Sequence, residues 1–380
     1  MQRWQVLISG CGPVGAVLAA RLGALGVRTL VVERDPAPYP LPRAVAADDE
    51  VQLLLSRTAP GLLDGALGDQ HVRFLDARRR LLGEIAFPRS EHGFSGLAFF
   101  HQPTLEQRLR AHLATLPTVE VRLGVELVGF VQDDASVRAW LADGSTVAAD
   151  WLVGCDGASS GVRRGAGLGW RGRDLAARWL VADVVGTVPD RQRFTYTCDP
   201  ARPQVDLPVP GGHRWEWLVR SGPATDGRSP GGAEGSPDPL QLIRRDTDAP
   251  VELVRAVTYR FGARRAEHWS AGRVLLAGDA AHTMPPFAGQ GLGAGIRDAW
   301  SLAWRLAAGD PRGYEAERAP HVRQMTRLSL LLGATLQASH GAPARDALLR
   351  GAFAAPGLGP WLARGGPRSS VSGVLTSRSG

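Results

Sequence analysis

The sequence contains no lysine and only three cysteines. Its 44 basic residues are therefore all arginines, which outnumber the 37 acidic residues and give a formal net charge of +7. Because the arginines are scattered and do not cluster with aromatic residues, a nucleic-acid-binding groove is not expected. Cys11, Cys155 and Cys198 form no CxxC pair and have no metal-ligand spacing, so neither a metal site nor a disulfide framework is expected. This cysteine usage is typical of a reducing, cytoplasmic setting.

Long apolar runs are also absent. No uninterrupted apolar stretch approaches the about 20 residues that cross a bilayer, so a soluble protein with no membrane partner is expected. The first apolar run, Val6–Ser9, leads directly into a glycine-rich turn, which is not the pattern of a signal peptide. A chain of 380 residues with an ordinary apolar content suits two interleaved domains with a proper core.

A glycine-rich turn follows the first predicted strand, Trp4–Ser9, and precedes a predicted helix, Ala16–Leu25. The turn has the form GxGxxG and includes Gly10, Gly12, Pro13, Val14 and Gly15. Its first two glycines allow a tight turn and the approach of a pyrophosphate, and the third allows the helix to pack closely on the strand. Glu33 ends the next predicted strand and is expected to bind the adenosine ribose hydroxyls, with Arg34 beside it. The segment predicts a dinucleotide site, for either FAD or NAD(P).

A second strand-and-helix junction lies at residues 272–306. The apolar run Val274–Ala277 ends at Gly278 and Asp279, and apolar residues at helical spacing follow from Leu292 to Leu306. Between them stand Pro285, Pro286, Gly289, Gly291 and Gly293. A carboxylate at a strand end accepts sugar-like hydroxyls, and a helix start offers N–H groups and partial positive charge to an electron-rich group. The alternative is a glycine-rich turn between two core elements. Since such a junction has no use in an NAD domain, the two motifs together favour FAD.

These motifs resemble those of the FAD-dependent class A aromatic hydroxylases, and most closely the 3-(3-hydroxyphenyl)propionate hydroxylase branch. The similarity rests on the N-terminal GxGxxG, on Gly278-Asp279-Ala280-Ala281-His282 with Pro285-Pro286-Phe287 and Gly289-Gln290-Gly291, and on a run from Cys155-Asp156-Gly157 to Arg163. The resemblance implies that Asp279 holds the ribityl chain and that Gly278, Gly289 and the helix start at Gly291, Leu292 and Gly293 lie at the isoalloxazine end. It also implies that Asp156 and Gly157 belong to a motif that links FAD and pyridine-nucleotide use.

Three further residues receive roles from the resemblance. Arg43, which follows an extended segment at Pro40–Pro42, is implied to lie near the FAD pyrophosphate and the incoming nicotinamide cofactor. Gln102 is implied to lie against the flavin dinucleotide. Asp49 corresponds to an acidic residue that can face the substrate in phenol-oxidising relatives, and the alternative is ordinary negative charge at a helix start.

The expected fold class is α/β, with a Rossmann-like FAD-binding domain of the p-hydroxybenzoate hydroxylase type and an inserted α+β substrate domain on a mainly antiparallel sheet. The FAD-binding segments are expected at 1–70, 99–175 and 265–312, the substrate domain at 71–98 and 176–264, C-terminal helices at 313–364 and a disordered tail at 365–380. A mobile loop is expected at 221–239. Trp215 and Trp217 share one strand face and are either core or a pocket wall, with core as the default. Many relatives continue into a thioredoxin-like domain, which this chain is expected to lack.

The resemblance implies an enzyme that uses NADH or NADPH and O2 to hydroxylate an electron-rich, phenolic aromatic through a flavin C4a-hydroperoxide. Pro286 and Phe287 are expected to form apolar walls that keep water from the reaction. Alternatives on the same scaffold are an epoxidase, a Baeyer–Villiger-type oxygenase, a flavin reductase or a non-catalytic flavin-binding protein. A monomer and a homodimer both remain open.

Overall fold

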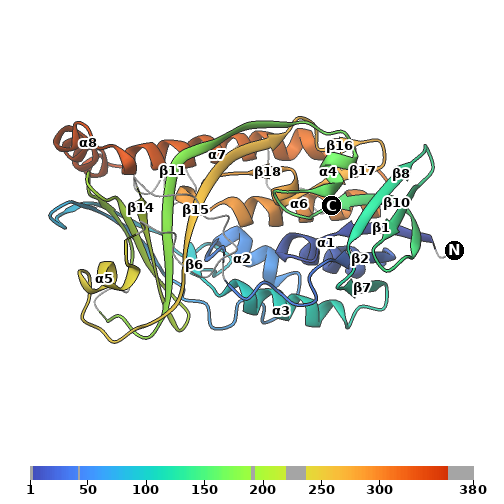
Figure 1. Ribbon diagram of the computed structural model, residues 1–380, viewed down its shortest axis with the longest axis horizontal. Helices are drawn as coiled ribbons and strands as arrows, with labels where there is room; N and C mark the ends of the chain where they lie inside the picture. The colour runs from blue at the N-terminus through green and yellow to red at the C-terminus, as the bar shows by residue number, and fades with distance from the viewer. Residues whose placement is uncertain (1–2, 42, 190–192, 220–236, 358–380) are drawn as a thin grey trace.

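A computed structural model describes residues 3–41, 43–189, 193–219 and 237–357 (Figure 1). Pro42, most of the loop expected at 221–239 and the whole tail at 365–380 lie outside the described residues. Within the described ranges, no helix combines the length and the apolar character needed to cross a bilayer.

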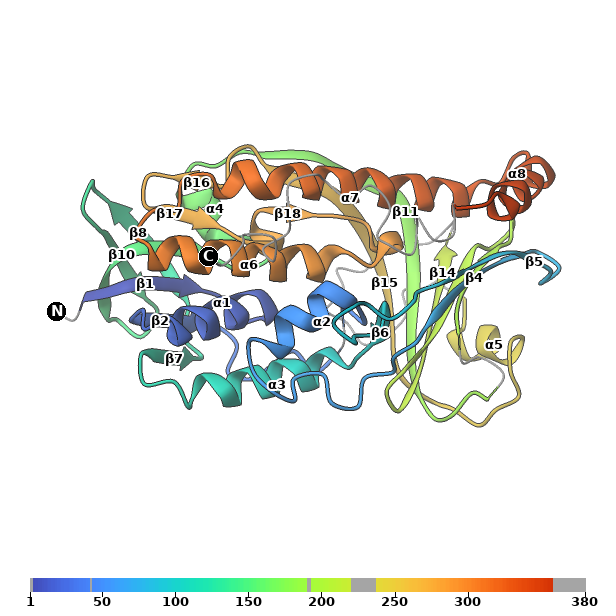
Figure 2. The same ribbon diagram turned by 180° about the vertical axis from the view of Figure 1, so that it is seen from behind.

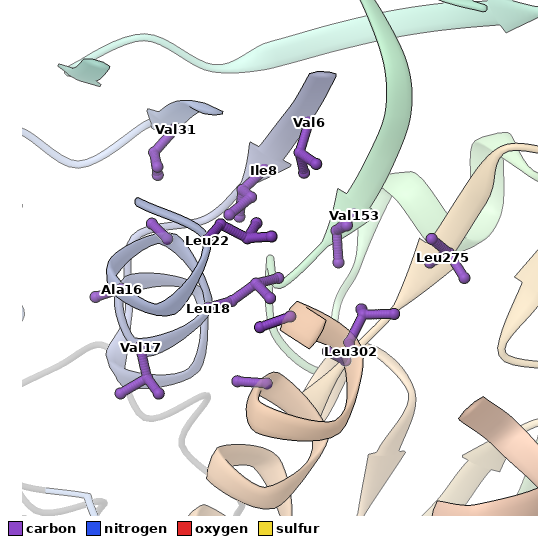
Figure 3. Packing of buried hydrophobic residues seen from close by; sticks show 14 of the residues in the cluster. Val6, Ile8, Ala16, Val17, Leu18, Leu22, Val31, Val153, Leu275 and Leu302 are labelled. Carbon is purple, nitrogen blue, oxygen red and sulfur yellow. The ribbon is translucent and has the colours of Figure 1, made fainter. Parts of the chain in front are cut away.

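The first sheet is mainly parallel, in the order β16-β17-β10-β1-β2-β7, with β9 paired to β10 and β8 paired to β9. Its strands are β1 (Arg3–Ser9), β2 (Thr29–Glu33), β7 (Val119–Leu123), β8 (Leu127–Gln132), β9 (Val137–Leu141), β10 (Thr146–Gly154), β16 (Ser270–Ala271) and β17 (Val274–Leu276). The central strands read as continuous apolar runs because helices cover them. Figure 3 shows this packing, with side chains of β1, β10 and β17 directed at α1 and at Leu302 of α6.

The second sheet is mainly antiparallel, in the order β18-β15-β11-β14-β13-β12-β4-β5. Its strands are β4 (His71–Asp76), β5 (Leu81–Ala86), β11 (Trp170–Val185), β12 (Phe194–Cys198), β13 (Gln204–Val209), β14 (Gly212–Val219), β15 (Glu252–Ala266) and β18 (His282–Thr283). The pairing of β12 with β4 is parallel. A small separate sheet joins β3 (Ala46–Asp48) to β6 (Leu97–Phe99).

The two sheets lie at opposite ends of an elongated molecule, and the strands β11 and β15 run between them (Figures 1 and 2). The helix α7 runs along the long axis from near β16 and β17 to the end that holds the second sheet, where it meets α8. The helices are α1 (Pro13–Ala24), α2 (Asp49–Ser56), α3 (Gln102–Leu113), α4 (Gly161–Gly165), α5 (Pro239–Arg244), α6 (Gly291–Ala307), α7 (Tyr314–Gln337) and α8 (Ala342–Ala354), with short 3-10 turns η1 (Gly278–Ala280) and η2 (Pro286–Ala288). This arrangement is the predicted α/β class.

The second sheet departs from the sequence-based expectation in two places. Apolar runs typical of strands are visible in the sequence only at Trp179–Val184 and Arg255–Phe261, whereas β11 and β15 continue well beyond these runs and pair with each other. Their extra residues are rich in arginine and glycine and lack the alternation of a half-buried strand, because they cross between the sheets. The strand β13 is hard to recognise from its sequence, because it contains Pro208 and the buried Asp206.

Trp215 and Trp217 belong to the core, as the default interpretation predicted. Both are almost completely buried and pack with Leu242 and Ile243 of α5, on a hydrophobic cluster separate from the large core of the first sheet. The neighbouring residues of the same strand, Arg214 and Glu216, therefore face the opposite side of the sheet.

Candidate active site

One cavity of about 510 Å³ extends from the carboxyl ends of the first sheet to the face of the second. Of the residues singled out from the sequence, its wall contains Gly10, Gly12, Pro13, Val14, Glu33, Arg34, Arg43, Gln102, Asp156, Gly157, Asp279, Pro286, Phe287, Gly289, Gly291 and Leu292. Gly15, Gly278, Gly293 and Asp49 are not among the lining residues. The structure thus brings together side chains from segments that are far apart in the sequence.

The first glycine turn has a conformation that leaves its backbone open to the cavity. Gly10 has a φ of +103°, and a Cβ there would lie 2.5 Å from the carbonyl oxygen of Cys155. A Cβ on Gly12, which precedes α1, would meet no protein atom within 4 Å and would project into open space. The carboxylate of Glu33 is oriented by the backbone N–H groups of Cys11 and Asp35, at 2.7 and 3.0 Å. The turn and the start of α1 can therefore receive a phosphate, with Glu33 beside it.

The three glycines outside the wall have a packing role. A Cβ on Gly15 would lie 2.0 Å from the carbonyl oxygen of Gly10, which supports the close helix–strand packing expected for the third glycine. A Cβ on Gly278 would lie 2.9 Å from Cγ2 of Val14, and one on Gly293 would lie 2.9 Å from Nη1 of Arg297. A Cβ on Gly293 would also lie 3.1 Å from Cγ2 of Val51 on α2, so Gly278 and Gly293 permit the close approach of other elements.

The helix α3 directs three polar residues, four positions apart, at the cavity. The side-chain oxygen of Gln102 accepts hydrogen bonds from the backbone N–H groups of Arg43 and Ala44, at 3.1 and 2.6 Å, and its amide donates to Glu106 at 2.7 Å. One turn further on, Arg110 has its Nε and Nη1 buried with no hydrogen-bond partner in the described structure. A guanidinium that faces a cavity with two buried, unpartnered nitrogens is a site for an anion.

Glu106 and Arg110 were not predicted from the sequence. The signal that could have found them is their spacing from Gln102, since residues i, i+4 and i+8 share one helix face. Burial raises the pKa of Glu106, although Gln102 and the nearby arginines partly oppose the shift.

Asp156 has two differently used carboxylate oxygens. Oδ2 accepts hydrogen bonds from the backbone N–H groups of Gly161 and Val162, at 2.7 and 3.1 Å, and so holds the start of α4. Oδ1 is buried and has no hydrogen-bond partner within the described residues. Arg163, on the same helix, donates to the carbonyl of Ala280 at 2.9 Å and stacks on Trp170, which ties α4 to the 3-10 turn η1.

Asp279 projects from η1 into the cavity, where its side chain is open to solvent. The cavity is surrounded by protein, so Asp279 is still partly removed from bulk water, and this desolvation raises its pKa against the opposing charges of His282 and Arg43. A buried cluster supports this turn from behind. The carboxylate of Asp298 accepts the backbone N–H of Gly278 at 3.2 Å and lies 2.6 Å from Nε2 of His282. Arg318 completes the cluster by donating to Asp298 at 3.0 Å.

The acidic start of α2 is used for structure. Asp48 caps the helix by accepting the N–H of Val51 at 2.9 Å, and Arg297 of α6 binds both oxygens of Asp48 at 2.9 and 2.8 Å and Glu50 at 2.5 Å. Asp49 is the first residue of α2 and does not line the cavity. Asp48, next to Asp49, thus has the role of ordinary negative charge at a helix start.

The end of the cavity at the second sheet is aromatic. It is lined by Phe99, Phe194, Tyr196 and Phe287. The distance between ring centroids is 5.7 Å for Phe99 and Phe194 and 4.7 Å for Phe194 and Tyr196. The hydroxyl of Tyr196 donates to the carbonyl of Phe287 at 2.7 Å. Trp179 packs edge-on against Phe287, with ring centroids 5.4 Å apart. The rings therefore form a fixed wall that a flat apolar molecule can contact.

Arg214 and Glu216 also line this end and were not predicted. The signal in the sequence is their alternation with Trp215 and Trp217, since charged residues between two core residues of a strand must face the other side of the sheet. Arg214 donates to both oxygens of Asp183 on β11, at 2.6 and 3.1 Å.

A cavity of this kind defines a class of protein. Its first half offers unpaired Arg110 and Asp156 atoms, an open glycine turn and a carboxylate in position for a ribose, which together fit a dinucleotide. Its second half is an aromatic chamber on a separate sheet. The molecule is therefore a dinucleotide-binding protein in which a second sheet lines the far end of the same cavity.

Comparison with known proteins identifies the family. The family model "FAD binding domain" matches residues 3–329. A 3-(3-hydroxy-phenyl)propionate/3-hydroxycinnamic acid hydroxylase from Burkholderia vietnamiensis (strain G4 / LMG 22486) is 40% identical over 375 residues, covering 94% of this chain and 68% of the relative. The chain thus belongs to the FAD-binding domain family of flavoprotein hydroxylases, as the sequence motifs predicted, and FAD is its cofactor.

Two further relatives agree. A hydroxylase of the same name from Mycobacterium sp. (strain JLS) is 37% identical, covering 93% of this chain and 64% of the relative. The crystal structure of aklavinone-11 hydroxylase with FAD and aklavinone matches with a TM-score of 0.74 and 28% identity, covering 90% of this chain and 70% of that one. The chain spans about two thirds of the length of the curated relatives that it matches.

Proposed function

We propose that this chain is a monooxygenase that uses NAD(P)H and O2 to hydroxylate a phenolic aromatic substrate at its bound FAD. The observation that carries the proposal is the single cavity that joins the dinucleotide site to the aromatic chamber. The names of the curated relatives support the reaction class and suggest 3-(3-hydroxyphenyl)propionate and 3-hydroxycinnamic acid as first substrates to test.

FAD, when bound, supplies the transfer of electrons from NAD(P)H to O2 and of one oxygen atom to the ring. The protein binds and orients it. In the proposed arrangement Glu33 holds the adenosine ribose, the turn at Gly10 and Gly12 with Arg110 holds the pyrophosphate, and Asp279 holds the ribityl hydroxyls. The free N–H groups at the start of α6, near Gly291 and Leu292, direct partial positive charge at the flavin end.

The aromatic chamber orients the substrate and excludes water. Phe287 is buried between Trp179 and Phe261 and lines the cavity next to Pro286, so both residues can shield the reaction as the sequence suggested. Arg43 lines the same cavity, with its guanidinium 4.7 Å above the ring of Tyr39. This position supports the proposal that Arg43 serves the incoming nicotinamide cofactor as well as FAD. No substrate contact is proposed for Asp49.

A substrate screen tests the proposed function. The purified holoenzyme is mixed with NADH or NADPH and with the two hydroxylated acids above or simple phenols, and cofactor oxidation is followed together with product mass. The expected result is faster NAD(P)H oxidation and a product carrying one additional oxygen atom on the ring. Stimulated oxidation without any oxygenated product, or ring expansion in its place, would contradict the proposal.

A further inference from the structure

Glu216 stands on β14 at the aromatic end of the cavity, away from the dinucleotide motifs. It lines the cavity, and its side chain is only 14% exposed. In the β14 ladder it lies between Val205 of β13 and Val181 of β11, so its carboxylate emerges from an apolar surface. A carboxylate in such a place is costly unless it has a partner.

The described structure supplies little compensation for this carboxylate. Glu216 accepts no hydrogen bond from any described residue, and its ion-pair partner, Nη1 of Arg214, is 3.9 Å away. Arg214 is itself engaged elsewhere, because Nε and Nη2 bind Asp183 and Nη1 donates to the carbonyl of Arg43 at 3.2 Å. Glu216 thus retains acceptor capacity that points into the cavity.

The other groups around Glu216 do not offer a better acceptor for a ligand. Arg255 of β15 is buried and lies 3.4 Å from Asp183, so the cluster of Arg214, Arg255, Asp183 and Glu216 is balanced in charge. Tyr196 of β12 already donates its hydroxyl to Phe287. Burial raises the pKa of Glu216, with Arg214 and Arg255 opposing the shift and Asp183 adding to it. The difference between the pKa of this carboxyl group and the pKa of a phenol is therefore smaller than it is in water.

We propose that Glu216 accepts a hydrogen bond from the phenolic hydroxyl of the substrate and takes up its proton. The proton moves from the phenol oxygen to a carboxylate oxygen, the phenol becomes a phenolate, and the pair keeps one negative charge throughout. The phenolate has higher electron density on the ring, which is what an electrophilic oxygen transfer requires. This inference rests on the proposed function, since it names the group that recognises and activates the phenolic substrate.

The proposal also has a consequence for selectivity. A cavity-facing carboxylate prefers a ligand that donates a hydrogen bond, and it disfavours an ether of the same shape, which can only accept. A purely structural Glu216, present only to balance Arg214, would not distinguish the two ligands by their hydroxyl group.

Ligand binding to the holoenzyme tests this directly through perturbation of the visible flavin spectrum, without any turnover. The probes are m-cresol with its methyl ether, 3-methylanisole, and 3-hydroxycinnamic acid with 3-methoxycinnamic acid. We expect the wild type to bind each phenol at least about tenfold more tightly than its ether, or about 1.4 kcal/mol. Glu216→Leu should reduce that ratio to about one, and Glu216→Gln should retain part of it but lose most of the hydroxylation rate.

Glu252→Gln is the matched control, because Glu252 is exposed at the start of β15 in the same sheet. It should keep the wild-type ratio. The FAD content of each variant verifies that the fold is retained, and Glu216→Gln changes the shape of the side chain least. An unchanged phenol-to-ether ratio in Glu216→Leu, or no binding of any phenol to the wild type, would overturn the inference.

The two proposals fail separately. If the binding ratio depends on Glu216 but no oxygenated product forms, the recognition of phenols stands and the proposed hydroxylase function fails. If the product forms and the ratio is unaffected by Glu216→Leu, the function stands and the role of Glu216 is wrong.

Discussion

At the scale of single residues, the carboxylate of Asp279 lines the cavity and is the side chain that we propose binds the ribityl chain. We predict that Asp279→Ala weakens FAD binding roughly ten- to a hundredfold, because a charge-assisted hydrogen bond to a ligand contributes about 1.5–3 kcal/mol. Folding should be affected much less, since the side chain is open to the cavity. Titration of the apoprotein with FAD measures the effect. Asp310→Ala, at an accessible turn where Asp310 pairs with Arg312, is the control. Wild-type affinity in Asp279→Ala would remove this residue from the site.

Arg110 offers a second test, because its buried Nε and Nη1 lack a partner in the described structure. We predict that Arg110→Ala also lowers FAD affinity by roughly ten- to a hundredfold, through loss of a contact to phosphate. Arg110→Lys should recover only part of it, since an ammonium group cannot reproduce the two parallel hydrogen bonds of a guanidinium. Arg138→Ala, on the exposed side of β9, should bind FAD like the wild type. If the wild type, both Arg110 variants and Arg138→Ala bind FAD with equal affinity, Arg110 does not contact the cofactor.

Arg43 has an exposed side chain that lines the cavity and stacks on Tyr39. We predict that Arg43→Ala keeps most of its flavin but needs roughly ten- to a hundredfold more NADPH for half-maximal reduction, because one phosphate contact is lost. Stopped-flow reduction at varied NADPH concentration measures this. A concentration dependence identical to that of the wild type would leave Arg43 as a surface charge without a role in the nicotinamide site.

At the scale of elements, the flavin end depends on how closely α6 approaches α1. A Cβ on Gly295 would lie 2.6 Å from Cγ2 of Val14 and 3.2 Å from the Cα of Gly278. We therefore predict that Gly295→Ala lowers the free energy of unfolding by about 1–3 kcal/mol, as overpacking does, and disturbs FAD binding. Urea unfolding of the apoprotein measures the stability change separately from the cofactor.

The matched control is the same substitution in an open environment. Gly351 lies in α8, and a Cβ there would meet nothing within 4 Å. Gly351→Ala should leave the stability unchanged or raise it by up to about 1 kcal/mol, because alanine has the higher helix propensity. A similar loss of stability in both variants would mean that close packing against α1 is not the cause.

At the scale of the whole molecule, the cavity proposed for FAD lies between parts of the chain that are distant in sequence, and we predict that the cofactor is held without a covalent bond. The cysteine that lines the cavity, Cys155, is a poor nucleophile because burial raises its pKa well above the usual range. Acid or heat denaturation should release all of the flavin into the supernatant, where its absorbance is measured. Flavin that sediments with the precipitated protein would contradict the prediction.

The dinucleotide half of the molecule could be predicted from the sequence because its determinants are local. The turn at Gly10 and Gly12, Glu33 at the end of the next strand and Asp279 at the end of β17 each follow a short apolar run. Backbone geometry at a strand end is set by the neighbouring residues, so these positions can be recognised without knowing the rest of the fold. The resemblance to flavoprotein hydroxylases added Gln102, Asp156 and the family.

The substrate half was decided by the tertiary structure. The helix α5 covers one face of β14, so Trp215 is buried there, and the opposite face with Glu216 meets the cavity. Which face is covered depends on how the sheet packs in the tertiary structure. Arg110 lies about two helical turns after Gln102 on α3, and the packing of α3 on α1 places it in the site. These features depend on contacts between residues far apart in the chain, and short-range sequence patterns carry no information about which distant surfaces will meet.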